Sequence, residues 1–125
     1  SFLLEKIKFL EEQTNKRRSN ANYYREHLLN SNLILPVEED YERCVNHLFV
    51  IRIKNREKLQ KYLKSNGIET KVHYPTPIHK LKAAQDLEFD LPKTEEYAKT
   101  ILSLPIHSGL SEENLEKIVT TINEF

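Results

Sequence analysis

Apolar positions in the first part of the chain recur in steps of three and four residues. Residues 1–30 contain neither glycine nor proline. The positions of the stripe are Leu3, Ile7, Leu10, Thr14, Ala21, Tyr24 and Leu28. This spacing predicts a long helix with one buried face. A helix of about 28 residues would be roughly 42 Å long, which exceeds the width of a domain of this size. We therefore expect its first half to pack on protein outside this chain.

The next segment predicts a strand, a helix and a second strand. Residues 47–53, H-L-F-V-I-R-I, are rich in β-forming residues and indicate a strand. Asn55 can cap the helix that follows, and Gly67 can end it. Residues 68–73 alternate in the way expected of another strand. These elements predict a right-handed β-α-β unit.

Two more helices and a short strand complete the predicted fold. Thr94 can start one helix, and Ser111 can cap the last one. Their inward positions are Tyr97, Ala98, Ile101 and Leu102, then Leu115, Ile118, Val119 and Ile122. Residues 102–107 include a short strand, expected at an edge because Pro105 lacks an amide donor. The chain is predicted to be α+β, with helices layered on a small, largely antiparallel sheet.

Composition narrows the class of protein. A chain of 125 residues that is 38% hydrophobic can bury a core without disulfides or metal. Lysine plus arginine equal aspartate plus glutamate at 19 each, so no net charge attracts nucleic acid or an anionic membrane. No apolar run spans a bilayer, and the single cysteine, Cys44, fits a cytoplasmic location. Because methionine is absent even at position 1, we expect a piece of a longer protein.

The segment V-H-Y-P-T-P-I-H, Val72 to His79, concentrates the candidate chemistry. Its two prolines favour an extended backbone over residues 74–77. In a polyproline-like segment His73 and His79 would lie roughly 19 Å apart. One metal ion could not bind both without a sharp reversal, and no third ligand motif is present, so we expect no metal site. No G-x-S-x-G motif supports nucleophilic hydrolysis either.

Two interpretations of this loop remain open from the residues alone. His73, Tyr74 and His79 could contact a ligand, since a proline-stiffened loop presents imidazole and phenol groups at little ordering cost. They could equally pack the loop or be solvated. His47, at the start of the predicted strand, is most simply a core histidine with satisfied hydrogen bonds, and His107 a turn residue.

Four segments in this order resemble a known family. They are N-K-R-R-S-N-A-N-Y-Y, N-H-L-F-V-I-R, V-H-Y-P-T-P-I-H and L-S-L-P-I-H-S-G-L-S-E-E. Together they are similar to the C-terminal part of the pyridoxal-phosphate-dependent sugar aminotransferases of the DegT/DnrJ/EryC1/StrS family. The resemblance implies a fold-type I aminotransferase, in which residues 1–30 link a large domain missing here to a small C-terminal domain, residues 31–125.

The resemblance also implies a reaction and its partners. Such enzymes are homodimers that transfer an amino group, usually from glutamate, to a nucleotide-linked keto sugar for amino-sugar and surface-polysaccharide biosynthesis. The family's large domain holds pyridoxal phosphate and its lysine, so this chain should contain no catalytic or cofactor-binding residue and should be inactive alone. The matching residues His73, Tyr74, His79 and His47 are expected to bind the sugar nucleotide.

A different class of function stays in competition. The chain could be a free-standing α+β module that binds a small metabolite or regulates another protein. Nucleic-acid binding ranks below both, because the net charge is zero and no basic groove is predicted. Only two glycines, Gly67 and Gly109, are present, so neither function can use a Gly-rich phosphate loop within this chain.

Overall fold

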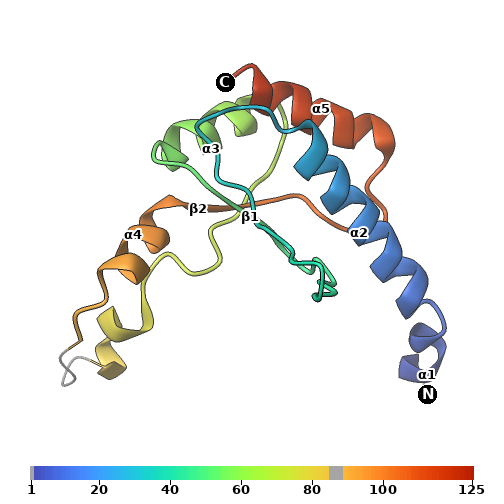
Figure 1. The fold of residues 1–125 in the computed structure, drawn as a ribbon, viewed down its shortest axis with the longest axis horizontal. Helices are drawn as coiled ribbons and strands as arrows, with labels where there is room; N and C mark the ends of the chain where they lie inside the picture. Colours follow the sequence, from blue (N-terminus) through green and yellow to red (C-terminus); the bar gives the residue numbers. More distant parts are fainter. Residues whose placement is uncertain (1, 85–88) are drawn as a thin grey trace.

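The computed structural model describes residues 2–84 and 89–125, and it has the α+β architecture predicted from the sequence. In Figure 1, α3 and α5 lie above a small sheet at the centre, α2 runs down the right-hand side, and α4 extends to the left. The chain starts at the far end of the α1–α2 arm and ends beside α5. None of the helices in the described ranges is long and apolar enough to cross a membrane.

The sheet is built from two short antiparallel strands. β1, Phe49–Arg52, pairs with β2, Ile101–Leu104, so that Ile51 lies opposite Leu102. Two isolated bridges extend it on either side: Ile34 pairs with Arg52, and Lys71 pairs with Ser103, both antiparallel. The spatial order is therefore Ile34, β1, β2 and Lys71, which places β2 inside the sheet.

Two sequence predictions about the sheet are wrong. The strand expected over residues 68–73 is reduced to the single bridge at Lys71. β2 is not an edge strand, because β1 pairs with one side of it and Lys71 bridges the other. The strand ends at Leu104, so Pro105 lies beyond the paired residues. β1 and Lys71 are both antiparallel to β2, so they run parallel to each other with β2 between them. α3, Arg56–Ser65, connects them as the helix of a split β-α-β unit.

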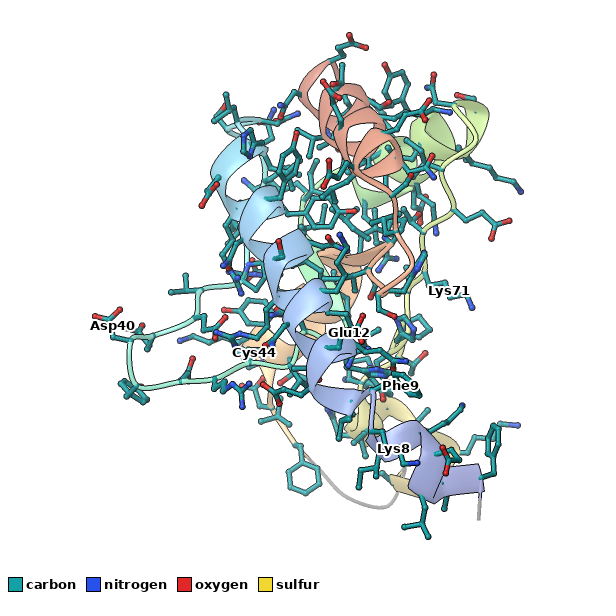
Figure 2. The ribbon with its side chains drawn as sticks, turned by 90° about the vertical axis from the view of Figure 1, so that its right-hand side faces the viewer. Lys8, Phe9, Glu12, Asp40, Cys44 and Lys71 are labelled. Atoms are coloured by element: carbon teal, nitrogen blue, oxygen red, sulfur yellow. The ribbon has the colours of Figure 1, made fainter. Side chains whose placement is uncertain are left out.

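The predicted first helix is interrupted. α1 spans Phe2–Ile7 and α2 spans Leu10–His27, with a turn at Lys8 and Phe9 that is visible in Figure 2. Only the second half of the stripe is buried, at Thr14, Ala21, Tyr24 and Leu28. Leu3, Ile7 and Leu10 are 74%, 64% and 53% exposed. The first half therefore has no packing partner among the described residues.

The core lies between the helices and the sheet. Tyr24 of α2 packs against Phe49 of β1 with ring centroids 5.0 Å apart, and both are fully buried. α5, Glu112–Asn123, starts as predicted, since the Ser111 hydroxyl accepts a hydrogen bond from the Asn114 amide. All four of its predicted inward residues are buried. The capping and the apolar stripe thus specify α5 correctly.

Helices α3 and α4 differ in detail from the prediction. Asn55 precedes α3 but makes no side-chain capping hydrogen bond, whereas Gly67 follows it with φ +76°, as a C-terminal stop requires. α4, Pro92–Thr100, starts two residues before Thr94 with proline in its first turn. The residues expected near its end, Ile101 and Leu102, belong to β2 instead.

Candidate functional site

The loop from Val72 to His79 begins directly after a residue that is hydrogen-bonded to the sheet. Lys71, immediately before it, exchanges backbone hydrogen bonds with Ser103 of β2. Residues 74–77 form neither helix nor strand, and Pro77 has φ −58° and ψ 146°, which is polyproline-like. The chain then turns into a short 3₁₀ helix, η1, Ile78–Lys80. The backbone is thus extended at Pro77 but bends at Thr76, and His79 lies in the short helix that ends the loop.

The imidazole of His73 is held against the sheet. Its Nδ1 lies 2.9 Å from the hydroxyl oxygen of Ser103, a buried residue of β2. A hydrogen bond at Nδ1 fixes the ring orientation and leaves Nε2 as the nitrogen that can meet a ligand. Strand β2 therefore positions both the backbone at Lys71 and the side chain of His73.

A hollow of about 540 Å³ opens beside His73. Three histidines that are far apart in the sequence line it: His47, His73 and His107. The pairing of β1 and β2 explains this meeting, because Phe49 lies opposite Leu104 and the residues just outside the pair share one end of the sheet. His47 is solvent-exposed and lies before β1, so it is not the core histidine favoured by the residues alone.

His107 is the functional candidate that the sequence analysis missed. The sequence predicts a turn residue here, and this prediction is confirmed, because the Leu110 amide donates to the His107 carbonyl at 3.3 Å across Ser108 and Gly109. The same carbonyl oxygen accepts a hydrogen bond from Asn20 of α2 at 3.1 Å, which fixes the segment after β2. The signal that could have found it is the antiparallel pairing of β1 and β2, since this register brings it close to His47.

The polar groups around the hollow are mostly donors or cations. Besides the three imidazoles, the hollow is lined by the polar side chains of Ser103, Asn114, Lys71 and Lys117. One carboxylate, that of Glu69, lines it as well. Such a set favours a polar ligand that carries negative charge, for example a phosphate or a carboxylate. Residues 2–84 and 89–125 contain no group of three or more histidine, cysteine, aspartate or glutamate side chains placed to hold a metal ion.

Tyr74 and His79 do not line the hollow. Tyr74 is 74% exposed, on the loop between His73 and the prolines. The side chain of His79 is only 6% exposed, and its Nε2 lies 3.2 Å from the Glu95 carboxylate of α4. The structure thus brings two of the four sequence-predicted residues, His47 and His73, into one hollow and leaves the other two on the adjoining loop.

Glu95 contacts two consecutive residues of η1. Besides His79, its carboxylate lies 3.1 Å from the Lys80 ammonium. The hydrogen bond from His79 and then that from Lys80 lower the pKa of Glu95 below its usual range. This carboxylate therefore stays ionised and joins the end of the loop to α4.

A second ionic cluster fixes the loop segment that precedes His47. Glu38 lies 2.7 Å from Arg18 and 3.3 Å from Arg25, both on α2. Arg18 also donates to the carbonyl of Cys44, and the Cys44 amide donates to Glu38. Figure 2 shows the loop that carries Cys44 extending beside α2. These contacts tie the segment before His47 to the long helix.

Comparisons with known proteins agree with this geometry. Residues 1–123 match the DegT/DnrJ/EryC1/StrS aminotransferase family. The chain is 38% identical over 121 residues to the dTDP-3-amino-3,6-dideoxy-alpha-D-galactopyranose transaminase of Aneurinibacillus thermoaerophilus, a match that covers 96% of this chain and 33% of that protein. It is 36% identical to a pleiotropic regulatory protein of Geobacillus stearothermophilus, over 100% of this chain and 35% of that protein.

The fold agrees with solved structures as well. The crystal structure of S. venezuelae DesV matches with a TM-score of 0.93 and 30% identity, over 98% of this chain and 34% of DesV. The chain thus spans about a third of the length of the relatives it matches. The resemblance stated from the four sequence segments is confirmed, and the chain belongs to the DegT/DnrJ/EryC1/StrS aminotransferase family.

Proposed function

We propose that this chain is the C-terminal third of an aminotransferase that moves an amino group from an amino acid, glutamate, to a nucleotide-linked keto sugar. The observation that carries the proposal is the family match over residues 1–123. The similar transaminase of Aneurinibacillus thermoaerophilus, whose name specifies a dTDP-linked amino sugar, supports the substrate class. The hollow with its donors and cations is suited to the anionic part of such a substrate.

We infer that the pyridoxal phosphate site lies outside the described residues. All lysines in residues 2–84 and 89–125 are solvent-exposed, whereas a lysine that forms a Schiff base is activated by burial or by a neighbouring cation. The cofactor, when bound, supplies the electron sink for amino transfer. We therefore assign its binding to the part of the enzyme that this chain does not contain, and we expect the isolated chain to be inactive.

The role of this chain is to bind and orient the sugar nucleotide. His73 can present Nε2 because Ser103 engages Nδ1, and His47 faces the same hollow. Tyr74 is exposed on a loop stiffened by prolines, where its ring and hydroxyl can contact a ligand with little ordering cost. His79 belongs to the same loop, but its side chain is enclosed.

Substitutions in the intact enzyme test this role. His73→Ala and Tyr74→Ala should raise the Michaelis constant for the nucleotide sugar about tenfold, as expected for the loss of a polar contact to a charged ligand. The control is His27→Ala, since His27 stacks on Tyr23 and does not line the hollow. Unchanged Michaelis constants for both variants would refute the assignment of these residues to the substrate.

We also propose that the intact enzyme is a cytoplasmic homodimer in amino-sugar and surface-polysaccharide biosynthesis. Support comes from the family and from the amino sugar in the name of the similar transaminase. Light scattering of the intact protein should give twice the mass of one chain. A fully active monomer would contradict the proposed dimer, but it would not contradict the proposed reaction.

A regulatory function is the second candidate, because one similar protein is named a pleiotropic regulatory protein. A regulator that binds a metabolite would bind the nucleotide sugar without converting it. Calorimetric binding of the nucleotide sugar, together with an absence of amino transfer when an amino acid and pyridoxal phosphate are supplied, would favour regulation over catalysis.

A further inference from the structure

The loop that carries the candidate site is attached to the rest of the molecule at both ends. At its start, Lys71 and His73 bond to Ser103 of β2. At its end, His79 and Lys80 bond to Glu95 of α4. α4 ends at Thr100 and β2 begins at Ile101, so both attachment points lie on one continuous segment, residues 92–104.

That segment is itself fixed to the core. The Arg56 guanidinium donates to the carbonyl of Ala98 at 2.7 Å, and Ala98 is buried. The Arg52 guanidinium lies 4.0 Å from the centre of the Tyr97 ring, a cation–π contact. α4 is therefore held by β1 and by the start of α3. A carboxylate on α4 can hold a loop in place only because the helix has these contacts.

We propose that Glu95 is a positioning residue for nucleotide-sugar binding, which acts by holding His79 and so fixing the loop from His73 to His79 beside the hollow. The side chain of His79 is only 6% exposed, so its imidazole contacts the protein rather than solvent, whereas Tyr74 is open to solvent. Removing the carboxylate leaves an enclosed imidazole without its acceptor, a costly state that loop displacement relieves. The lowered pKa of Glu95 is consistent with this contact.

The kinetic test rests on the proposed function and uses the intact enzyme. Glu95→Ala should raise the Michaelis constant for the nucleotide sugar about fivefold to tenfold while turnover changes less than about twofold. Glu95→Gln, which keeps an acceptor oxygen, should raise it less. Glu96→Gln is the matched control, because it removes one negative charge from the next residue of α4 and should leave both constants unchanged. A general loss of folded enzyme would lower turnover and leave the Michaelis constant unchanged.

A double-mutant cycle tests whether Glu95 acts through His79. The effects of Glu95→Ala and His79→Ala on the Michaelis constant should not add, because either change breaks the same contact. If the fold-change in the Michaelis constant of the double variant equals the product of the two single fold-changes, the two residues act separately and the proposal is wrong.

A readout that needs no reaction separates this proposal from the proposed function. Limited trypsin digestion of the intact protein should cut faster after Lys80 and Lys82 in Glu95→Ala than in wild type or Glu96→Gln. If the intact wild type does not transfer amino groups, the proposed function fails while faster cutting still supports the loop attachment. Cutting rates equal to wild type, or an unchanged Michaelis constant in an active enzyme, would overturn the proposal.

Discussion

At the scale of single residues, a few side chains join segments that are far apart in the sequence. The Tyr24 hydroxyl donates to the carbonyl of Pro105 at 2.7 Å, and Asn20 donates to the carbonyl of His107. Both donors lie on α2, and both acceptors lie on the segment that follows β2 and lines the hollow. Burial raises the pKa of Tyr24 far above its ordinary value, so the hydroxyl stays protonated as a donor.

Tyr24→Phe should remove this hydrogen bond and keep the packing of the ring on Phe49. Because the Pro105 carbonyl loses its donor, we expect the free energy of unfolding to fall by about 1–2 kcal/mol, measured by urea denaturation. Tyr23→Phe is the control, since the Tyr23 ring stacks on the exposed residue His27. Equal urea midpoints for the two variants would contradict the role given to the Tyr24 hydroxyl.

Because of Glu38, the free energy of unfolding of the chain should decrease as the pH falls into the acidic range. The Cys44 amide and then Arg18 lower its pKa below the ordinary value of 4.5. A carboxyl group with a lowered folded pKa contributes stability that is fully present above the unfolded value and is lost as the pH falls through the folded value. Glu38→Gln should therefore reduce stability at neutral pH and flatten its decline below pH 4.5. Denaturation at several pH values measures this, with the exposed Glu39→Gln as the control, whose curve should follow wild type.

At the scale of elements, prediction succeeded where the signal was local. The start of α5 and its buried face follow from Ser111 and from an apolar stripe within twelve residues. The position of β2 inside the sheet did not follow, because it depends on the distant partners Phe49–Arg52 and Lys71. The turn at Lys8 and Phe9 has no glycine or proline to mark it. Residues 2–10 are exposed, and helices depend on packing more than on intrinsic propensity.

Gly67 is required by the backbone at the end of α3. Its φ is +76°, a region that residues with a Cβ rarely adopt, although an added Cβ would find space, with the Lys117 ammonium 3.9 Å away. Gly67→Ala should therefore lower the free energy of unfolding by about 1 kcal/mol. Gly109→Ala, where φ is not positive, should have a smaller effect. An equal loss at the two positions, measured by thermal unfolding, would contradict this explanation.

The candidate site shows the same limit of sequence reasoning. The loop with His73 and Tyr74 was found because it is a contiguous motif. His107 was missed because its proximity to His47 arises from strand pairing. The contact between His79 and Glu95 joins residues 16 positions apart on different elements, and no local pattern signals it.

At the scale of the whole molecule, the N-terminal arm carries an apolar surface. We call it the N-terminal apolar face, and its exposed residues are Phe2, Leu3, Leu4, Ile7, Phe9 and Leu10. The core lies at the other end of α2, around Ala21 and Tyr24. A large exposed apolar surface on a protein commonly marks an interface. The proposed function assigns this face to the rest of the enzyme.

The isolated chain should consequently self-associate. Replacing Leu3 and Ile7 by lysine should shift it toward the monomer in sedimentation velocity runs across a range of concentrations, with little change in its urea midpoint, since neither side chain is buried. The control for altered surface charge replaces Lys58 and Lys61, which are exposed and away from the face, by alanine, a charge change of equal size and opposite sign. A wild-type chain that stays monomeric at high concentration would contradict the assignment of this face to an interface.

The central claim is that the protein containing this chain transfers an amino group to a nucleotide-linked keto sugar. The most direct measurement incubates the intact protein with pyridoxal phosphate, a nucleotide keto sugar and glutamate labelled with ¹⁵N at its amino group, and follows the nucleotide sugar by mass spectrometry. We predict that ¹⁵N appears in the nucleotide sugar with the intact protein and does not appear with this chain alone. Folded, cofactor-loaded intact protein that leaves a panel of nucleotide keto sugars free of ¹⁵N would contradict the account.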